Sequence, residues 1–142
     1  MSPLRIKVPR WVGVALSRRL ARSTTRPGSV VPPPAPLALT RRSLLYFKSE
    51  GCAPCDGIDL FIGRLAASAG LDLRVIDARR GQVLEHGYGG PLLLDRTGEI
   101  GRAYGVQVFP TLLVTTAGGE VERVLVGGEA DEHVVRERLG LE

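Results

Sequence analysis

The stretch that organises the chain is GCAPC at residues 51–55, which holds the only two cysteines among 142 residues. A short apolar run, SLLYF at 43–47, lies just before it and predicts a buried strand. Apolar residues then recur at helical spacing from 58 to 69, so an amphipathic helix is expected over residues 54–69. Two cysteines separated by two residues, between a strand and a helix, are typical of a redox site.

The position of the two thiols relative to the helix predicts different roles for them. A thiolate attacks a disulfide, and the free N–H groups and dipole of a helix N-terminus stabilise its charge. Pro54 fits the first turn, where its missing N–H costs nothing. We therefore expect Cys52 to be the exposed attacking thiol. Cys55, one turn into the helix, would be the covered thiol that resolves the mixed disulfide.

Charge divides the chain into two unlike parts. Residues 1–49 carry ten Lys and Arg and no acid, whereas residues 50–142 carry nine basic and fifteen acidic side chains. The proline-rich run VVPPPAP at 30–36 favours an extended, semi-rigid spacer. We therefore expect residues 1–40 to be a basic, disordered tail and residues 41–142 to form one small α/β domain.

The basic tail suggests contacts and a location. Its apolar run WVGVAL at 11–16 is too short to span a membrane and short for a signal peptide. Residues 1–26 are instead expected to bind an anionic membrane surface through Trp11 and the arginines, and no fold motif supports contact with nucleic acid. Two cysteines in one motif argue against a disulfide-stapled secreted scaffold. The expected location is the cytoplasm, with the tail at a membrane, and export is the alternative.

Beyond residue 70 the pattern alternates between strands and helices. Further strands are expected at 71–77, 91–94, 111–116 and 120–126, and helices at 99–104 and 131–139. The strand at 71–77 would lie parallel to the first strand through a right-handed crossover. Because Ala117-Gly118-Gly119 separates the last two strands, these should form an antiparallel hairpin.

Several of these runs follow one another in a recognisable order. They are LLYF at 44–47 before the CxxC motif, YGV at 104–106, and FPTLLV at 109–114, with Gly119 and Gly127 beyond. Together they resemble the thioredoxin superfamily over residues 42–140. The run PLLLDRTGE at 91–99 is more similar to the TlpA-like branch of that superfamily.

The resemblance implies a thioredoxin fold, in which a central mixed sheet is flanked by helices. It also implies a protein-disulfide oxidoreductase that exchanges its dithiol with protein substrates and with an upstream reductant or oxidant. Cys52 and Cys55 would be the catalytic residues, and neither a metal nor a cofactor beyond their redox-active disulfide is implied. Phe109 and Pro110 would dock the substrate, since in the family a cis proline lies against the dithiol and the residue before it pairs with the substrate backbone.

Three positions depart from the family pattern. Tyr46 stands six residues before Cys52, where many thioredoxins carry a buried Asp that relays protons. Gly51 stands in place of a Trp, and Asp56 in place of a basic residue. Asp56 favours the protonated thiol and also suits the first turn of a helix. Glu50 is the candidate for the missing proton transfer, with a solvated loop charge as the alternative reading.

Two other functions stay open from the residues alone. A peroxiredoxin-like thiol peroxidase would use Ser49, three residues before the first cysteine, although Leu45 replaces the expected proline. A metal-binding domain, for copper in particular, would combine the CxxC pair with His86 or His133, the only two histidines. Nothing in the spacing of these histidines indicates a ligand set.

Overall fold

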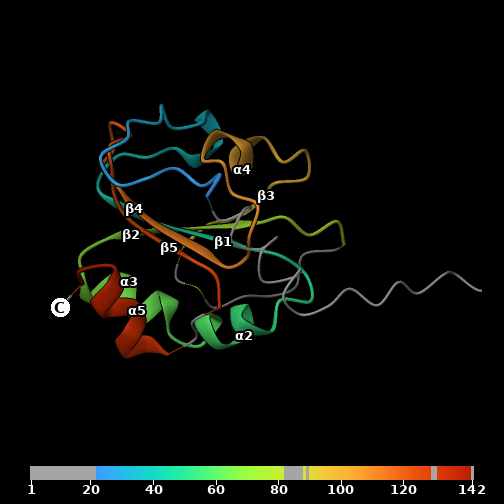
Figure 1. Cartoon of the computed structure of the whole chain (residues 1–142), viewed down its shortest axis with the longest axis vertical. Helices are drawn as coiled ribbons and strands as arrows, with labels where there is room; N and C mark the ends of the chain where they lie inside the picture. The colour runs from blue at the N-terminus through green and yellow to red at the C-terminus, as the bar shows by residue number, and fades with distance from the viewer. Residues whose placement is uncertain (1–21, 82–87, 89, 129–130, 142) are drawn as a thin grey trace, which may run out of the picture.

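The fold is built on one mixed sheet in the computed structural model of the chain, which describes residues 22–81, 88, 90–128 and 131–141 (Figure 1). The strands of this sheet are β1 (Ser43–Lys48), β2 (Asp72–Asp77), β3 (Leu92–Leu94), β4 (Thr111–Thr115) and β5 (Val121–Val126). They lie in the order β3-β2-β1-β4-β5. The chain thus has the α/β class and the mixed central sheet that its sequence predicts.

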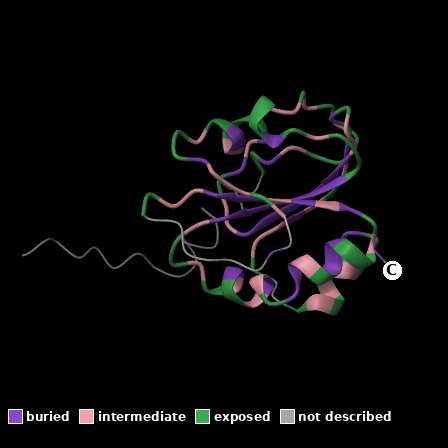
Figure 2. Ribbon diagram, turned by 180° about the vertical axis from the view of Figure 1, so that it is seen from behind, coloured by how far each residue is buried: buried purple, intermediate pink, exposed green. Residues whose placement is uncertain are grey.

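β1 is the central strand and is covered on both faces. It pairs parallel with β2 and antiparallel with β4, while β2 pairs parallel with β3 and β4 antiparallel with β5. All six residues of β1 are buried, and Figure 2 shows buried residues along the inner strands of the sheet. Because neighbouring side chains of a strand point to opposite faces, a strand buried on both faces carries a continuous apolar run.

The helices form one layer on each side of the sheet (Figure 1). On one side lie α2 (Ala53–Asp59), α3 (Ile62–Ser68) and α5 (Glu132–Arg138), and on the other lies α4 (Glu99–Ala103). Each layer buries its own apolar cluster, with Leu44 and Tyr46 of β1 entering the first and Leu45 and Phe47 the second. None of the described helices is long and apolar enough to cross a membrane.

The helix predicted at 54–69 is two helices in the structure. α2 ends at Asp59 and α3 begins at Ile62, with Leu60 and Phe61 between them. Leu60 is 83% exposed, whereas Phe61 is 6% exposed and packs in the first cluster. The helical spacing of apolar residues continues through Leu60 and Phe61, so the sequence predicts one helix. The helix is interrupted there because packing of the large Phe61 ring in the core outweighs local helix propensity.

Residues 22–40, which we call the strap, differ from the tail predicted for residues 1–40. The strap runs along the sheet edge and the α4 layer, and includes a short 3₁₀ helix, η1 (Ala35–Leu37), whose Leu37 is fully buried in the second cluster. Its backbone N–H groups donate to carbonyls of the domain at three points, Thr25 to Tyr104 at 2.9 Å, Gly28 to Val121 at 2.8 Å and Val31 to Gly119 at 2.8 Å. The domain therefore begins before residue 41.

Composition explains why this boundary was misplaced. Prolines and a lack of acids predict an extended backbone, but they do not tell whether that backbone is solvated or packed. Two glycines show the packing: a Cβ atom at Gly105 or Gly119 would collide with a strap carbonyl oxygen, that of Ser23 or Val31. Both glycines also have positive φ angles, +66° and +97°. The part of the predicted tail at residues 1–21 lies outside the described residues.

Candidate dithiol site

Cys52 and Cys55 form a disulfide at the start of α2, with their Cα atoms 5.2 Å apart. β1 leads into a short loop, and Cys52 is the N-cap of the helix that follows. The Cys52 sulfur accepts a hydrogen bond from the Cys55 backbone N–H at 3.3 Å, and Pro54 occupies the first turn. Cys55 is 1% exposed, whereas Cys52 is only half-buried. Solvent thus reaches one sulfur more easily than the other.

Phe109 and Pro110 lie at the same end of the sheet as the disulfide. β4 starts at Thr111, which pairs with Phe47 near the end of β1. Phe109 and Pro110, which directly precede Thr111, therefore lie at the end of the sheet where the CxxC motif begins. The Phe109–Pro110 peptide bond is cis. Cys52 and Phe109 both pack against the first apolar cluster. Among the described residues, no hydrogen bond reaches the backbone N–H or C=O of Phe109.

Glu50 is exposed and forms a hydrogen bond to a neighbouring loop. Its Oε1 accepts a hydrogen bond from the Gly81 backbone N–H at 3.2 Å, which ties the loop before the motif to the segment after β2. No hydrogen bond between described residues joins Glu50 to either cysteine. The geometry gives it a structural contact, and its role in proton transfer stays a prediction.

A group of four polar side chains, which we call the buried polar cluster, adjoins the backbone of Cys55 and consists of Tyr46, Lys48, Asp59 and Tyr88. Lys48 Nζ donates to Asp59 Oδ2 and to the Tyr88 hydroxyl, both at 2.7 Å. The Tyr46 hydroxyl lies 2.9 Å from Asp59 Oδ1 and 3.0 Å from the Cys55 carbonyl oxygen, both of which are acceptors. The rings of Tyr46 and Tyr88 meet edge to face, with centroids 6.4 Å apart. The cluster thus connects β1, α2 and the segment before β3.

Burial and hydrogen bonds shift the proton affinities of this cluster. Burial alone would lower the pKa of Lys48, but its hydrogen bonds to Asp59 and Tyr88 outweigh burial and raise that pKa above its ordinary value. Burial, followed by the charge of Asp59, raises the pKa of Tyr46. Burial also raises the pKa of Tyr88, although the hydrogen bond from Lys48 opposes it. At neutral pH the cluster therefore holds a cationic Lys48 and two protonated tyrosines.

Sequence reasoning noted Tyr46 as a departure but missed the cluster. One signal was present: Lys48 is a charged residue at the end of a strand that is otherwise apolar, and a buried lysine needs a partner. A second was the spacing of Asp59, four residues after Cys55, which places both side chains on one helix face. The ion pair between Lys48 and Asp59, 11 positions apart, could not be predicted without knowing how α2 packs on β1.

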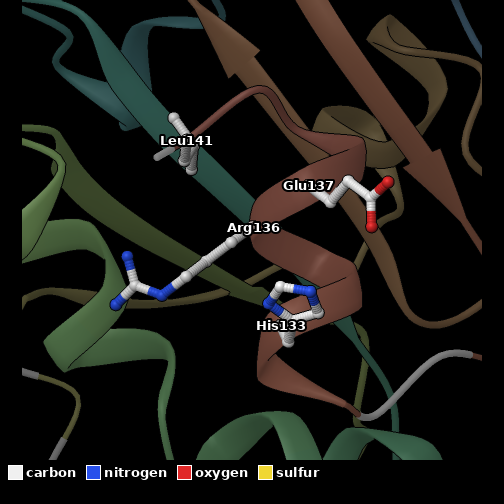
Figure 3. A pocket seen from close by; sticks show the side chains of 4 residues that line it. All are labelled: His133, Arg136, Glu137 and Leu141. Carbon is white, nitrogen blue, oxygen red and sulfur yellow. The ribbon is translucent and has the colours of Figure 1, made fainter.

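The structure offers no support for the metal-binding alternative in the part of the chain that it describes. Within that part, no three His, Cys, Asp or Glu side chains lie close enough together to hold a metal ion. His133 lies on α5 and lines a surface pocket with Arg136, Glu137 and Leu141 (Figure 3), and neither cysteine lines that pocket. His86 lies outside the described residues.

No protein-family model matches the chain, and no curated protein sequence matches it. Solved structures do match. A secreted Mycobacterium tuberculosis disulfide oxidoreductase, homologous to Escherichia coli DsbE, aligns over 76% of this chain and 86% of its own, with a TM-score of 0.60 and 19% identity. The thioredoxin domain of a Bacteroides vulgatus thiol-disulfide oxidoreductase aligns over 82% of this chain and 99% of its own, with a TM-score of 0.63 and 14% identity.

A third similar structure bears on location. The exposed lipoprotein thioredoxin of Streptococcus pneumoniae aligns over 72% of this chain and 85% of its own, with a TM-score of 0.56 and 17% identity. One of these neighbours is an exposed lipoprotein and another is secreted, and both count against the cytoplasmic location expected from the sequence. The expectation was wrong because a single redox pair on this scaffold is compatible with export, so cysteine content does not report the compartment. The identities are low and speak to architecture alone, and on architecture all three structures agree: the chain has the thioredoxin fold.

Proposed function

We propose that the protein is a thiol–disulfide oxidoreductase that exchanges the Cys52–Cys55 pair with disulfides of protein substrates. The observation that carries this proposal is the disulfide at the start of α2, in which a half-buried sulfur is linked to a buried one. Reduced Cys52 attacks a substrate disulfide and forms a mixed disulfide. Cys55 then attacks Cys52, the substrate leaves as a dithiol, and the pair is oxidised.

The start of α2 suits the attacking sulfur. A thiolate at Cys52 meets the free N–H groups of the first turn, and the Cys55 N–H already points at this sulfur in the oxidised form. Asp56, exposed in the same turn, adds a negative charge that opposes part of this stabilisation. The pair itself carries the electrons, so the proposed reaction requires no further cofactor.

Phe109 and Pro110 are proposed to dock the substrate chain. The Phe109 backbone lies at the motif end of the sheet and makes no hydrogen bond to other described residues, so its N–H and C=O can pair with an extended peptide as an added strand. The chemical class of substrate is then a protein disulfide in an exposed, extended segment.

We propose an exported location, on the strength of the secreted and lipoprotein neighbours. An upstream reductant or oxidant in the same compartment would restore the pair after each exchange. Detection of the protein outside the cytoplasm by cell fractionation supports this proposal, and recovery of all of it with cytoplasmic markers would contradict it.

Binding of residues 1–26 to vesicles with anionic lipids is a separate prediction, with neutral vesicles as the control.

The test of the proposed function is turnover of insulin disulfides by the purified protein with a small dithiol as reductant. We expect reduction that is lost in the Cys52→Ser variant. Peroxide consumption by the reduced protein, measured in parallel, separates the peroxidase alternative. Peroxide turnover without insulin reduction would overturn the proposal in favour of the peroxidase, and stoichiometric metal in reduced protein would favour the metal site.

A further inference from the structure

The buried polar cluster has no part in the exchange described above, and its burial is costly. Lys48 is 5% exposed, Tyr46 is fully buried and Tyr88 is 8% exposed, while the Asp59 side chain keeps 24% of its surface in contact with solvent. A buried ammonium group loses most of its hydration, so it is tolerated only with a close counter-charge. Apolar side chains of similar volume would fill the same space without this cost.

The cluster is joined to Cys55 in two ways. The Tyr46 hydroxyl lies within hydrogen-bond distance of the Cys55 carbonyl oxygen and of the Asp59 carboxylate, so one side chain links β1 to both residues of α2. Asp59 also follows Cys55 by four positions within the helix, which sets their side chains next to each other on one face. We therefore expect a charge on Asp59 or Lys48 to act on the Cys55 sulfur, because the burial of Tyr46 and Lys48 limits screening by water.

We propose that the Lys48–Asp59 ion pair, held against Cys55 by Tyr46, sets the pH at which the Cys55 thiol loses its proton. The proposal deepens the thiol–disulfide exchange proposed above and rests on it. In the resolving step the Cys55 proton passes to solvent and its thiolate attacks Cys52. A Cys52–Cys55 bond forms and the Cys52–substrate bond breaks. The electron pair leaves with the substrate sulfur, which takes up a proton. Lys48, Asp59 and Tyr46 are positioning residues in this step.

The charges that face Cys55 act in opposite directions. The Asp59 carboxylate opposes a thiolate and the Lys48 ammonium favours one, so the two charges of the intact pair offset each other's effect on the thiol. Asp56 is exposed on the same helix, and Tyr88 meets Lys48 as an uncharged hydroxyl. Further out, Glu50 bonds to Gly81 and Arg79 pairs with Asp77.

Removal of one partner leaves the other uncompensated and gives shifts of opposite sign. Asp59→Asn keeps the shape of the side chain and leaves the cation, so the Cys55 thiolate should form at lower pH. Lys48→Met keeps most of the side-chain length and leaves the anion, so the thiolate should form at higher pH. An uncompensated, partly buried charge near a thiol shifts the midpoint of its titration by about one pH unit, which changes the thiolate fraction at a given pH about tenfold.

The experiment titrates the Cys55 thiolate by its ultraviolet absorbance in a Cys52→Ser background, where no second thiol contributes. Asp56→Asn is the matched control, because it removes the same charge from an exposed site of the same helix, and we expect its shift to be less than half that of Asp59→Asn. Asp59→Glu keeps the charge and should return the midpoint toward the parent value. Near-ultraviolet circular dichroism checks that each variant is folded.

Opposite shifts for Asp59→Asn and Lys48→Met support the proposal. Shifts in the same direction, no shift in either, or an equal shift in Asp56→Asn would overturn it. If Lys48→Met does not fold, Asp59→Asn compared with Asp56→Asn and Asp59→Glu still decides. The titration uses no substrate, so it is independent of the insulin assay: a protein that shows the opposite shifts but reduces no insulin would refute the proposed function and leave the ion pair's effect on the thiol standing.

Discussion

At the scale of single residues, the two cysteines are distinguished by their surroundings rather than by their chemistry. Cys52 caps the helix and is half-buried, whereas Cys55 sits inside the first turn with 1% of its surface exposed. A protein disulfide is a bulky partner, and it reaches the outer sulfur first. The buried sulfur can react only with a disulfide that is already attached to Cys52.

This difference predicts opposite behaviour of two serine variants. Cys52→Ser should abolish reduction of insulin disulfides, because the accessible nucleophile is lost. Cys55→Ser should instead accumulate covalent mixed disulfides with substrate proteins, because the resolving attack is lost. Non-reducing gel electrophoresis after acid quenching measures the trapped species. Trapping by the Cys52 variant and not by the Cys55 variant would reverse the assignment.

Local spacing made this part of the site predictable. The two cysteines, the strand before them and the helix after them all lie within one stretch, and their relation depends on i, i+3 geometry alone. The Lys48–Asp59 contact depends instead on how α2 packs across β1, which no local pattern contains. Glu50 illustrates the same limit, because its contact with Gly81 spans 31 positions and directs its carboxylate toward the loop after β2.

At the scale of elements, the strap is the feature that composition misjudged. Its backbone bonds to β5 and to the end of α4, Arg74 of β2 donates to the carbonyl oxygens of Leu37 and Ala38, and Leu37 fills the second cluster. By contrast, periodicity predicted every strand of the described sheet to within about two residues, because alternation and continuous apolar runs report burial directly. A single buried leucine in a proline-rich segment leaves no period to detect.

The strap should contribute to stability through Leu37. Leu37→Ala removes a fully buried side chain and leaves a cavity, which lowers the free energy of unfolding by about 2–5 kcal/mol. Val30→Ala is the matched control within the same strap: Val30 is 68% exposed, so its loss should change stability by less than about 0.5 kcal/mol. Urea unfolding followed by far-ultraviolet circular dichroism measures both. Equal, small effects would mean that the strap is not packed in solution.

At the scale of the whole molecule, the raised pKa values of four buried groups make the stability of the fold depend on pH. Unfolding hydrates Tyr46, Lys48, Tyr88 and Tyr104 and returns them to ordinary pKa values near 10.0 for tyrosine and 10.5 for lysine. In the folded protein all four pKa values are higher, and burial alone raises that of Tyr104 to about 12. Three of these groups, Tyr46, Lys48 and Tyr88, belong to the buried polar cluster, so this cluster also contributes to how stability responds to alkali.

The sign of the effect follows from which state holds its protons more tightly. Folding stability from these groups is fully present below about pH 10, and it is lost as the pH rises toward the folded pKa values, because the unfolded chain releases protons first. Each proton released on unfolding steepens the loss by about 1.4 kcal/mol per pH unit. Urea midpoints from about pH 8 to about pH 11 should therefore be flat and then fall.

Tyr104→Phe isolates one of these groups. Within the described residues the Tyr104 hydroxyl is buried and has no hydrogen-bond partner, so its removal breaks no contact there and should leave stability at about pH 8 unchanged or higher. The same change deletes one titrating group, so the decline above about pH 10 should become shallower. Tyr46→Phe, by comparison, loses hydrogen bonds to Cys55 and Asp59 and should lower stability already at neutral pH. An alkaline decline that is as steep in Tyr104→Phe as in the parent would show that the hydroxyl titrates alike in both states, and would contradict its burial.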